Sequence, residues 1–203
     1  MYDIVHRVSM QYILTPHAKR IEPWAWWDNI FTDHELDWLQ EQAKSATDSA
    51  QVGGGQAGLV NSQIRRSQIS WLSNTTETQW VFNKFAHVVS QLNMEHFRFN
   101  LTGFGEPFQL TNYDQSENGM YGWHQDFGEG LSRKLSLTMQ LTDPNKYEGG
   151  ELQIFTGGDK PMSLPKKRGL IIAFPSYSVH QVTPVVCGSR QSLVAWTSGP
   201  GFK

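Results

Sequence analysis

The first half of the chain carries apolar residues at the spacing of amphipathic helices. In "FTDHELDWLQEQAKSA" they lie three or four positions apart, at Leu36, Leu39 and Ala43. Thr32 stands before this segment and Glu35 follows three residues later, which is the pattern of a capping box. Together these features predict a helix over residues 33–45.

A second helical pattern follows a loop and a strand. "SAQVGGGQAGLVNSQ", within residues 46–64, is polar and rich in glycine, which predicts a surface loop. A loop that covers a site and a simple linker both fit this composition. "IRRSQISWL" predicts a strand. Beyond it, Asn74 and Glu77 form another capping pattern and apolar residues again recur at helical spacing, so we expect a helix over residues 75–93.

From Phe97 onward the pattern changes to short β-like stretches separated by glycine, proline and asparagine. These stretches are "FRFNLT", "FQLTNYD", "YGWHQD", "KLSLTMQLT", "GELQIF", "GLIIAF", "SVHQVTPV" and "RQSLVAWT". About eight short strands at this spacing predict a sandwich or a double-sheet jelly roll, with the helices packed on one sheet and no parallel β-α-β units. We expect one mainly β domain over residues 1–203, with a helical support region over about 1–95 and the jelly-roll core over about 96–203.

Composition narrows the classes of function. The 203 residues contain no apolar run near the roughly 20 needed to cross a bilayer, so no membrane span is expected. The N-terminus lacks a signal-peptide pattern, which predicts a cytoplasmic protein. Cys187 is the single cysteine, which excludes an internal disulfide and a cysteine-based zinc site. A net charge of −2 without long basic runs gives no sign of nucleic-acid binding.

The candidate chemistry begins with "YGWHQD". Residues two apart on a strand point to the same face, so His124 and Asp126 project together while Gln125 points away. Alone this pair is a weak signal, and two ordinary polar residues at a strand end fit it equally well. His180, in the otherwise apolar stretch "SVHQVTPV", would complete a set of two imidazoles and one carboxylate. That set suits non-haem Fe(II) and leaves coordination positions open.

Arg190 is the candidate partner for an anionic co-substrate of such a metal. It lies ten residues beyond His180 and opens the last predicted strand, with Ser192 and Trp196 on the same face. A guanidinium group pairs with a carboxylate through two parallel hydrogen bonds, so Arg190 could hold the far end of a dicarboxylate. The alternative is an ordinary arginine at a surface turn.

The chain resembles the Fe(II)- and 2-oxoglutarate-dependent dioxygenases, in particular the prolyl 4-hydroxylase-like branch with the bacterial PKHD-type hydroxylases. Three stretches carry the resemblance: "NYDQSENGMYGWHQD", "LSLTMQLTDPNKYEGGELQIF" and "GLIIAFPSYSVHQVTPVVCGSRQSLVAW". They span about residues 108–196, whereas the N-terminal half is far less specific. The resemblance implies a double-stranded β-helix, that is, a jelly roll with the metal at its mouth.

The resemblance also implies roles for individual residues. The iron ligands would be His124, Asp126 and His180. The residues around 2-oxoglutarate would be Arg190 at its distal carboxylate, with Tyr113, Thr138, Gln140, Ser192 and Trp196. Residues toward the substrate would be Tyr121, Trp123 and Arg66. A core tyrosine at Tyr113, a solvated sheet face at 138 and 140, and a pair of solvated charges at Arg65 and Arg66 stay open as alternatives.

The implied reaction is hydroxylation of a C–H bond with release of succinate and carbon dioxide. Its cofactors would be Fe(II) and 2-oxoglutarate, with dioxygen as the oxidant and ascorbate as a candidate reductant. The leading substrate is a prolyl residue in a peptide or protein. A free amino acid or other small molecule is the alternative substrate, and a non-catalytic sensor that binds metal and 2-oxoglutarate is the alternative outside enzymes.

Overall fold

The computed structural model describes residues 22–50, 61–128 and 132–201. The N-terminal segment and the central part of the glycine-rich stretch, residues 51–60, lie outside these ranges. Within them the chain forms fourteen strands, two α-helices and three short helical turns. The predicted mainly β fold with two supporting helices is therefore confirmed, with more and shorter strands than expected.

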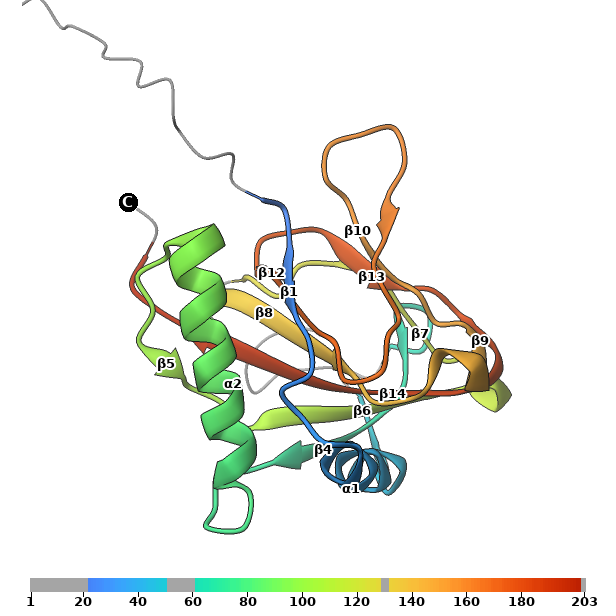
Figure 1. Cartoon of the computed structure of the whole chain (residues 1–203). Coiled ribbons are helices and arrows are strands. Elements are labelled where there is room, and N and C mark those ends of the chain that lie inside the picture. The colour runs from blue at the N-terminus through green and yellow to red at the C-terminus, as the bar shows by residue number, and fades with distance from the viewer. Residues whose placement is uncertain (1–21, 51–60, 129–131, 202–203) are drawn as a thin grey trace, which may run out of the picture.

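The strands form two antiparallel sheets. The larger sheet has the order β1 (Ala25–Trp27), β12 (Ile171–Pro175), β8 (Arg133–Gln140), β14 (Val185–Ser198), β6 (Phe108–Asp114), β4 (Gln68–Leu72) and β2 (Asp48–Ser49). Two short strands, β5 (Gly103–Phe104) and β9 (Tyr147–Gly149), also pair with β14. The smaller sheet has the order β11 (Met162–Ser163), β10 (Leu152–Ile154), β13 (His180–Val182), β7 (Met120–His124) and β3 (Arg65–Arg66). In Figure 1 the long strand β14 crosses the middle of the molecule between β8 and β6.

Helix α1 (Asp33–Lys44) begins at the predicted capping box. The backbone N–H of Glu35 donates to Thr32 Oγ1, and the Glu35 carboxylate accepts from the backbone N–H of Thr32 at 2.7 Å. Helix α2 (Gln79–Leu92) begins four residues later than predicted, and Thr78 rather than Asn74 is its N-cap. Residues 75–78 form a turn in which the Glu77 carboxylate accepts from the Thr75 hydroxyl, so Glu77 is not available to cap the helix.

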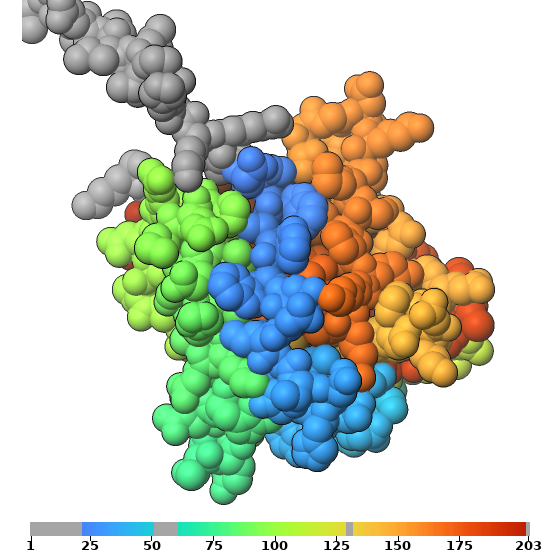
Figure 2. All heavy atoms as spheres, viewed as in Figure 1, coloured from blue at the N-terminus to red at the C-terminus, as the bar shows by residue number. Residues whose placement is uncertain are grey.

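Both helices pack on the outer face of the larger sheet, as the sequence predicts. One apolar cluster joins the two helices to this sheet, and its fully buried members include Leu39, Phe85, Val88, Leu135, Leu137, Met139, Leu193 and Ala195. A second cluster fills the space between the two sheets, with Ile172 and Phe174 from the larger sheet and Ile154 from the smaller one. Figure 2 shows the blue segment from residue 22 lying between α2 and the orange C-terminal part, which closes that side of the molecule.

Three segments differ from the predictions in ways that matter for the site. "FRFNLT" is not a strand, because Phe97 ends a π-helical turn (Asn93–Phe97) and Arg98 adopts a left-handed conformation. "IRRSQISWL" divides into β3 and β4, which belong to different sheets, so the N-terminal region contributes strands to both. In "YGWHQD" the strand ends at His124, and Asp126 lies in the turn that follows. No helix in the described ranges has the length and apolar character of a membrane span.

Candidate active site

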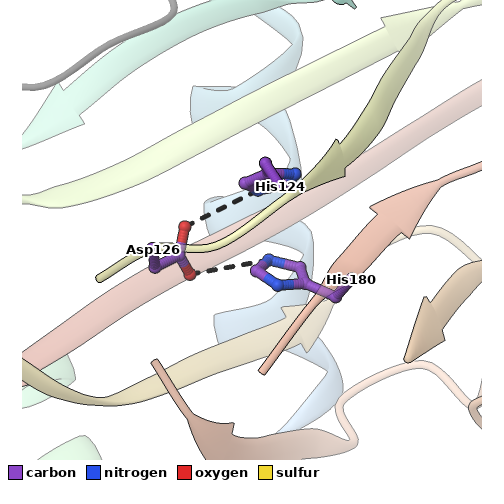
Figure 3. Close-up of side chains that lie close together, drawn as sticks. All are labelled: His124, Asp126 and His180. Carbon is purple, nitrogen blue, oxygen red and sulfur yellow. Dashed lines mark ion pairs between the residues drawn. The ribbon is translucent and has the colours of Figure 1, made fainter. Parts of the chain in front are cut away.

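The structure brings His124, Asp126 and His180 together at one end of the smaller sheet. His124 ends β7 and His180 begins β13, and the two residues face each other in the register of these strands. Their Nε2 atoms lie 3.6 Å from Oδ1 and Oδ2 of Asp126, respectively. The three side chains converge on one point (Figure 3), and their potential ligand atoms all lie within 4.8 Å of one another. This is a spacing at which one metal ion can contact all three.

Both histidines are held in the tautomer that a metal at Nε2 requires. His124 Nδ1 lies 2.8 Å from the carbonyl oxygen of Gly122, and His180 Nδ1 lies 2.9 Å from that of Ser178. A carbonyl oxygen only accepts, so Nδ1 carries the proton in each ring and the Nε2 lone pair is left for a ligand bond.

Asp126 is anchored by groups from two other segments. Its backbone N–H donates to the carbonyl of Ser176, and Oδ2 accepts from the Ser136 hydroxyl of β8 at 2.6 Å. Burial alone would raise the pKa of this carboxyl, yet His180, His124 and Ser136 hold it well below its usual range. Burial lowers the pKa of His180 to about 4. At neutral pH Asp126 is therefore an anion and His180 is neutral, as metal ligands must be.

The three residues lie on the wall of a cavity of about 940 Å³ between the sheets. Arg190, only 1% exposed, lies on the same wall with Tyr113, Thr138 and Ser192. Its Nε and Nη2 atoms are buried and make no hydrogen bond, and Nη1 has one long contact of 3.4 Å to the Ser192 hydroxyl. A buried guanidinium without an acceptor is costly, so this group is suited to receive a carboxylate. The donor set and this orphaned cation together fit Fe(II) and 2-oxoglutarate.

Gly150 makes room for the Arg190 side chain. A Cβ atom at Gly150 would come within 3.0 Å of Arg190 Cδ, and the backbone there has a φ of +56°. The neighbouring Gly149 has a φ of +73°, so both residues adopt a positive φ, which glycine tolerates without steric cost. The turn therefore shapes the space that the arginine occupies.

The other residues predicted for the site divide into two groups. Tyr121 and Trp196 line the cavity with the residues named above, and the Tyr121 ring stacks on the His124 ring at a centroid distance of 3.5 Å. Gln140 is buried outside the cavity lining, with neither of its side-chain polar atoms hydrogen-bonded. Trp123 is 44% exposed and does not line the cavity. Arg66 also lies off the cavity wall and donates to the backbone carbonyls of Asn118 and Ser62.

Two further basic residues line the cavity: Arg65, which the sequence did not separate from Arg66, and Arg133, which sequence reasoning missed. Arg133 lies over the Trp196 ring at 3.8 Å and forms two hydrogen bonds with the Glu106 carboxylate. No local spacing joins Arg133 to Glu106, which is 27 positions away. The alternation of β8 would put Arg133 on the apolar face with Leu135 and Leu137, so it gives no sequence signal for the position of Arg133 on the cavity wall.

Comparisons with known proteins agree with this geometry. Residues 108–198 match the model of the 2OG-Fe(II) oxygenase superfamily. A PKHD-type hydroxylase of Synechococcus sp. (strain CC9605) is 42% identical over 78 residues, which are 37% of this chain and 35% of that protein. Another, from Shewanella sp. (strain ANA-3), is 29% identical over 177 residues, which are 83% of this chain and 75% of that protein.

Solved structures extend the similarity to the fold of nearly the whole chain. A prolyl-4-hydroxylase of Pseudomonas putida superposes with a TM-score of 0.68 at 17% identity, covering 88% of this chain and 94% of that one. A prolyl hydroxylase of Trichoplax adhaerens, in complex with a peptide fragment of hypoxia inducible factor, gives a TM-score of 0.72 at 15% identity, covering 87% and 83%. The predicted jelly roll is confirmed. The chain is thus similar to the 2OG-Fe(II) oxygenase superfamily over residues 108–198 and to PKHD-type hydroxylases over most of its length.

Proposed function

We propose that this chain is an Fe(II)- and 2-oxoglutarate-dependent dioxygenase that hydroxylates a prolyl residue in a peptide or protein. The observation that carries the proposal is one cavity that holds both the His124, Asp126 and His180 set and the unpaired guanidinium of Arg190. When bound, Fe(II) and 2-oxoglutarate supply the oxidising chemistry with dioxygen, and succinate and carbon dioxide leave as products.

The protein's own residues hold the metal and the co-substrate in place and neutralise the charge of the co-substrate. The two imidazoles and one carboxylate of His124, His180 and Asp126 would hold the metal, and such a set leaves coordination positions open for co-substrate and dioxygen. Arg190 neutralises the distal carboxylate of 2-oxoglutarate, and the Thr138 and Ser192 hydroxyls lie on the same wall to donate further hydrogen bonds. Ser136 fixes the direction of the Asp126 carboxylate through the bond to Oδ2.

The substrate class is supported by the relatives and by the shape of the cavity. The relatives are PKHD-type hydroxylases, the structural neighbours are prolyl hydroxylases, and one of these was solved with a peptide. In this chain Trp71 and Phe127 lie on the cavity wall, and each is nearly half exposed. Exposed aromatic rings at an opening give an extended peptide apolar surface to pack on.

The test is succinate formation by iron-loaded protein with 2-oxoglutarate, oxygen and ascorbate. We expect proline-containing peptides to stimulate succinate release and to gain one oxygen atom by mass spectrometry. His124→Ala should abolish both signals, whereas Asp159→Ala, at an exposed aspartate away from the cavity, should keep them. Stimulation by free proline alone would refute the peptide substrate, and no succinate under any condition would refute the dioxygenase. Omitting ascorbate tests its role as reductant.

A further inference from the structure

Arg65 is a second buried guanidinium on the cavity wall, and its partner Gln109 lies four residues along β6 from Tyr113, which pairs with Arg190. Arg65 retains 8% of its surface exposed and lies on the cavity wall with Tyr121 and Gln109. The register of the smaller sheet puts it there, because Arg65 of β3 pairs directly with Tyr121 of β7. Its guanidinium carbon lies 4.5 Å from the centre of the Tyr121 ring.

All the partners of Arg65 are neutral. Nε donates to the Ser67 hydroxyl at 3.0 Å and Nη2 donates to Gln109 Oε1 at 2.7 Å. Nη1 has no hydrogen bond to the described residues. It is also not one of the fully buried atoms, so a ligand can reach it. Two of the five N–H groups of the guanidinium are therefore accounted for, and the rest are available to a ligand.

None of the three carboxylates on the cavity wall forms an ion pair with Arg65 in the described structure. Asp126 faces the two histidines, and Glu106 binds Arg133. Asp48 is exposed and forms no ion pair with Arg65 in the described structure. With 2-oxoglutarate assigned to Arg190, Arg65 keeps an uncompensated charge in a buried position.

A charge in this state favours an anionic ligand. Removing a guanidinium from water is costly, and neutral hydrogen bonds with one aromatic face offset only part of that cost. A carboxylate can accept from two N–H groups of one guanidinium in parallel, which is the strongest pairing open to arginine. Arg133 has such a partner in the Glu106 carboxylate, whereas Arg65 has no carboxylate partner among the described residues.

The position of Arg65 relative to the metal ligands fixes where the anion would lie. Arg65 covers one face of Tyr121, and the His124 ring stacks on Tyr121 at an interplanar angle of 15°. The guanidinium is thus separated from a metal ligand by a single aromatic ring. A group bound to Arg65 would therefore lie close to the metal ligand His124.

We propose that Arg65 binds a carboxylate of the primary substrate, next to the carbon that is hydroxylated. The inference rests on the proposed function and specifies its substrate as acidic. The carboxylate can belong to an acidic side chain beside the proline, to a C-terminal proline, or to a free amino acid, and the test separates these sources.

The test measures binding, without turnover, to protein loaded with Zn(II) and saturating 2-oxoglutarate. Three matched pairs are titrated by calorimetry: an internal Glu-Pro peptide against its Gln-Pro form, a peptide ending in proline against its C-terminal amide, and L-proline against L-prolinamide. We expect the acid to bind at least tenfold more tightly than its neutral partner in one pair. Arg65→Gln should abolish that difference, Arg65→Lys should keep part of it, and Arg66→Gln should leave it unchanged.

Equal binding of acid and neutral forms in all pairs would overturn the inference, as would a preference that survives Arg65→Gln. The affinity of Arg65→Gln for 2-oxoglutarate, expected to equal that of the wild type, verifies that the variant is folded. Acid-selective binding without succinate formation by the iron-loaded protein would keep the Arg65 site and refute the proposed function. Succinate formation without acid-selective binding would refute the Arg65 site and keep the proposed function.

Discussion

The two faces of strand β8 are both buried, yet they have opposite chemistry. Leu135, Leu137 and Met139 point to the helices and are fully buried in the apolar cluster there. The alternate residues point toward the smaller sheet and are polar: Ser136, Thr138 and Gln140. A strand with two buried faces would ordinarily be apolar on both. The difference indicates that one face serves stability and the other serves a ligand.

The same division continues in β14, the neighbour of β8. Leu193 and Ala195 join the apolar cluster, whereas Arg190, Ser192 and Trp196 face the cavity. Arg190 and Trp196 on the cavity wall have buried polar atoms without partners, and so does Gln140, which lies outside the cavity lining. Such atoms reduce the stability of a protein that lacks its ligand. The comparison therefore predicts that substitutions on the two faces will separate stability from activity.

Asp126→Ala should give the largest effect, because it removes the one carboxylate of the ligand set. We expect loss of bound iron and a fall in succinate formation of about a thousandfold or more, equivalent to about 4 kcal/mol in the barrier. Iron content after dialysis and initial rates of succinate release measure this. Asp159→Ala is the matched control, and retention of iron by Asp126→Ala would contradict the assigned site.

Leu137→Ala acts on the opposite face. It leaves a cavity in the cluster under the helices, so the free energy of unfolding should fall by about 2–5 kcal/mol. The affinity for 2-oxoglutarate of the folded fraction should stay unchanged. Denaturant titration and calorimetric binding report the two quantities, with Val186→Ala, at a residue 64% exposed on β14, as control. A selective loss of 2-oxoglutarate binding would show that the two faces are not independent.

Arg190→Met should reverse that pattern. The affinity for 2-oxoglutarate should fall by about 2–3 kcal/mol, because a charged pair with a carboxylate is lost. The free energy of unfolding of the ligand-free protein should stay the same or rise, because an unpaired buried charge is replaced by an apolar side chain. The same two measurements apply, with Arg66→Met as the control, and strong destabilisation without loss of affinity would overturn the assignment.

Ser136→Ala should have the smallest effect of the four. It removes the hydrogen bond to Asp126 Oδ2 and leaves the ligand in place. Loss of such a supporting contact typically lowers metal affinity by about tenfold, and stability should change by only about 1 kcal/mol. Competition with a chelator measures the affinity. Ser90→Ala, on the surface of α2, serves as control, and an affinity equal to the wild type would remove Ser136 from the support of the site.

Alternation along single strands made much of the core predictable. The stretches at β6 and β8 matched the observed strands closely because each keeps one period throughout. "FRFNLT" has the same alternation and failed for a tertiary reason. The Asn93 side chain donates to the Phe99 carbonyl and accepts from the Phe99 N–H, so it takes the hydrogen bonds that a neighbouring strand would need.

The site was predictable where it depends on local motifs. His124 and Asp126 are two positions apart in the sequence, and His180 stands out in an apolar stretch. The turn after β7, and not strand alternation, brings Asp126 to His124. The choice between Arg65 and Arg66 was not predictable, because it depends on the pairing of β3 with β7 across more than fifty residues. The role of Ser136 likewise depends on the contact between two sheets.

The hydrogen bonds of the histidine Nδ1 atoms have a consequence for how this protein can diverge. Each imidazole is oriented by a main-chain carbonyl two positions earlier in the chain, and a main-chain carbonyl persists whatever side chain its residue carries. Exchanges of the surrounding side chains therefore leave the direction of both ligands intact. Residues at the substrate end can therefore change while the geometry of the candidate metal ligands stays the same.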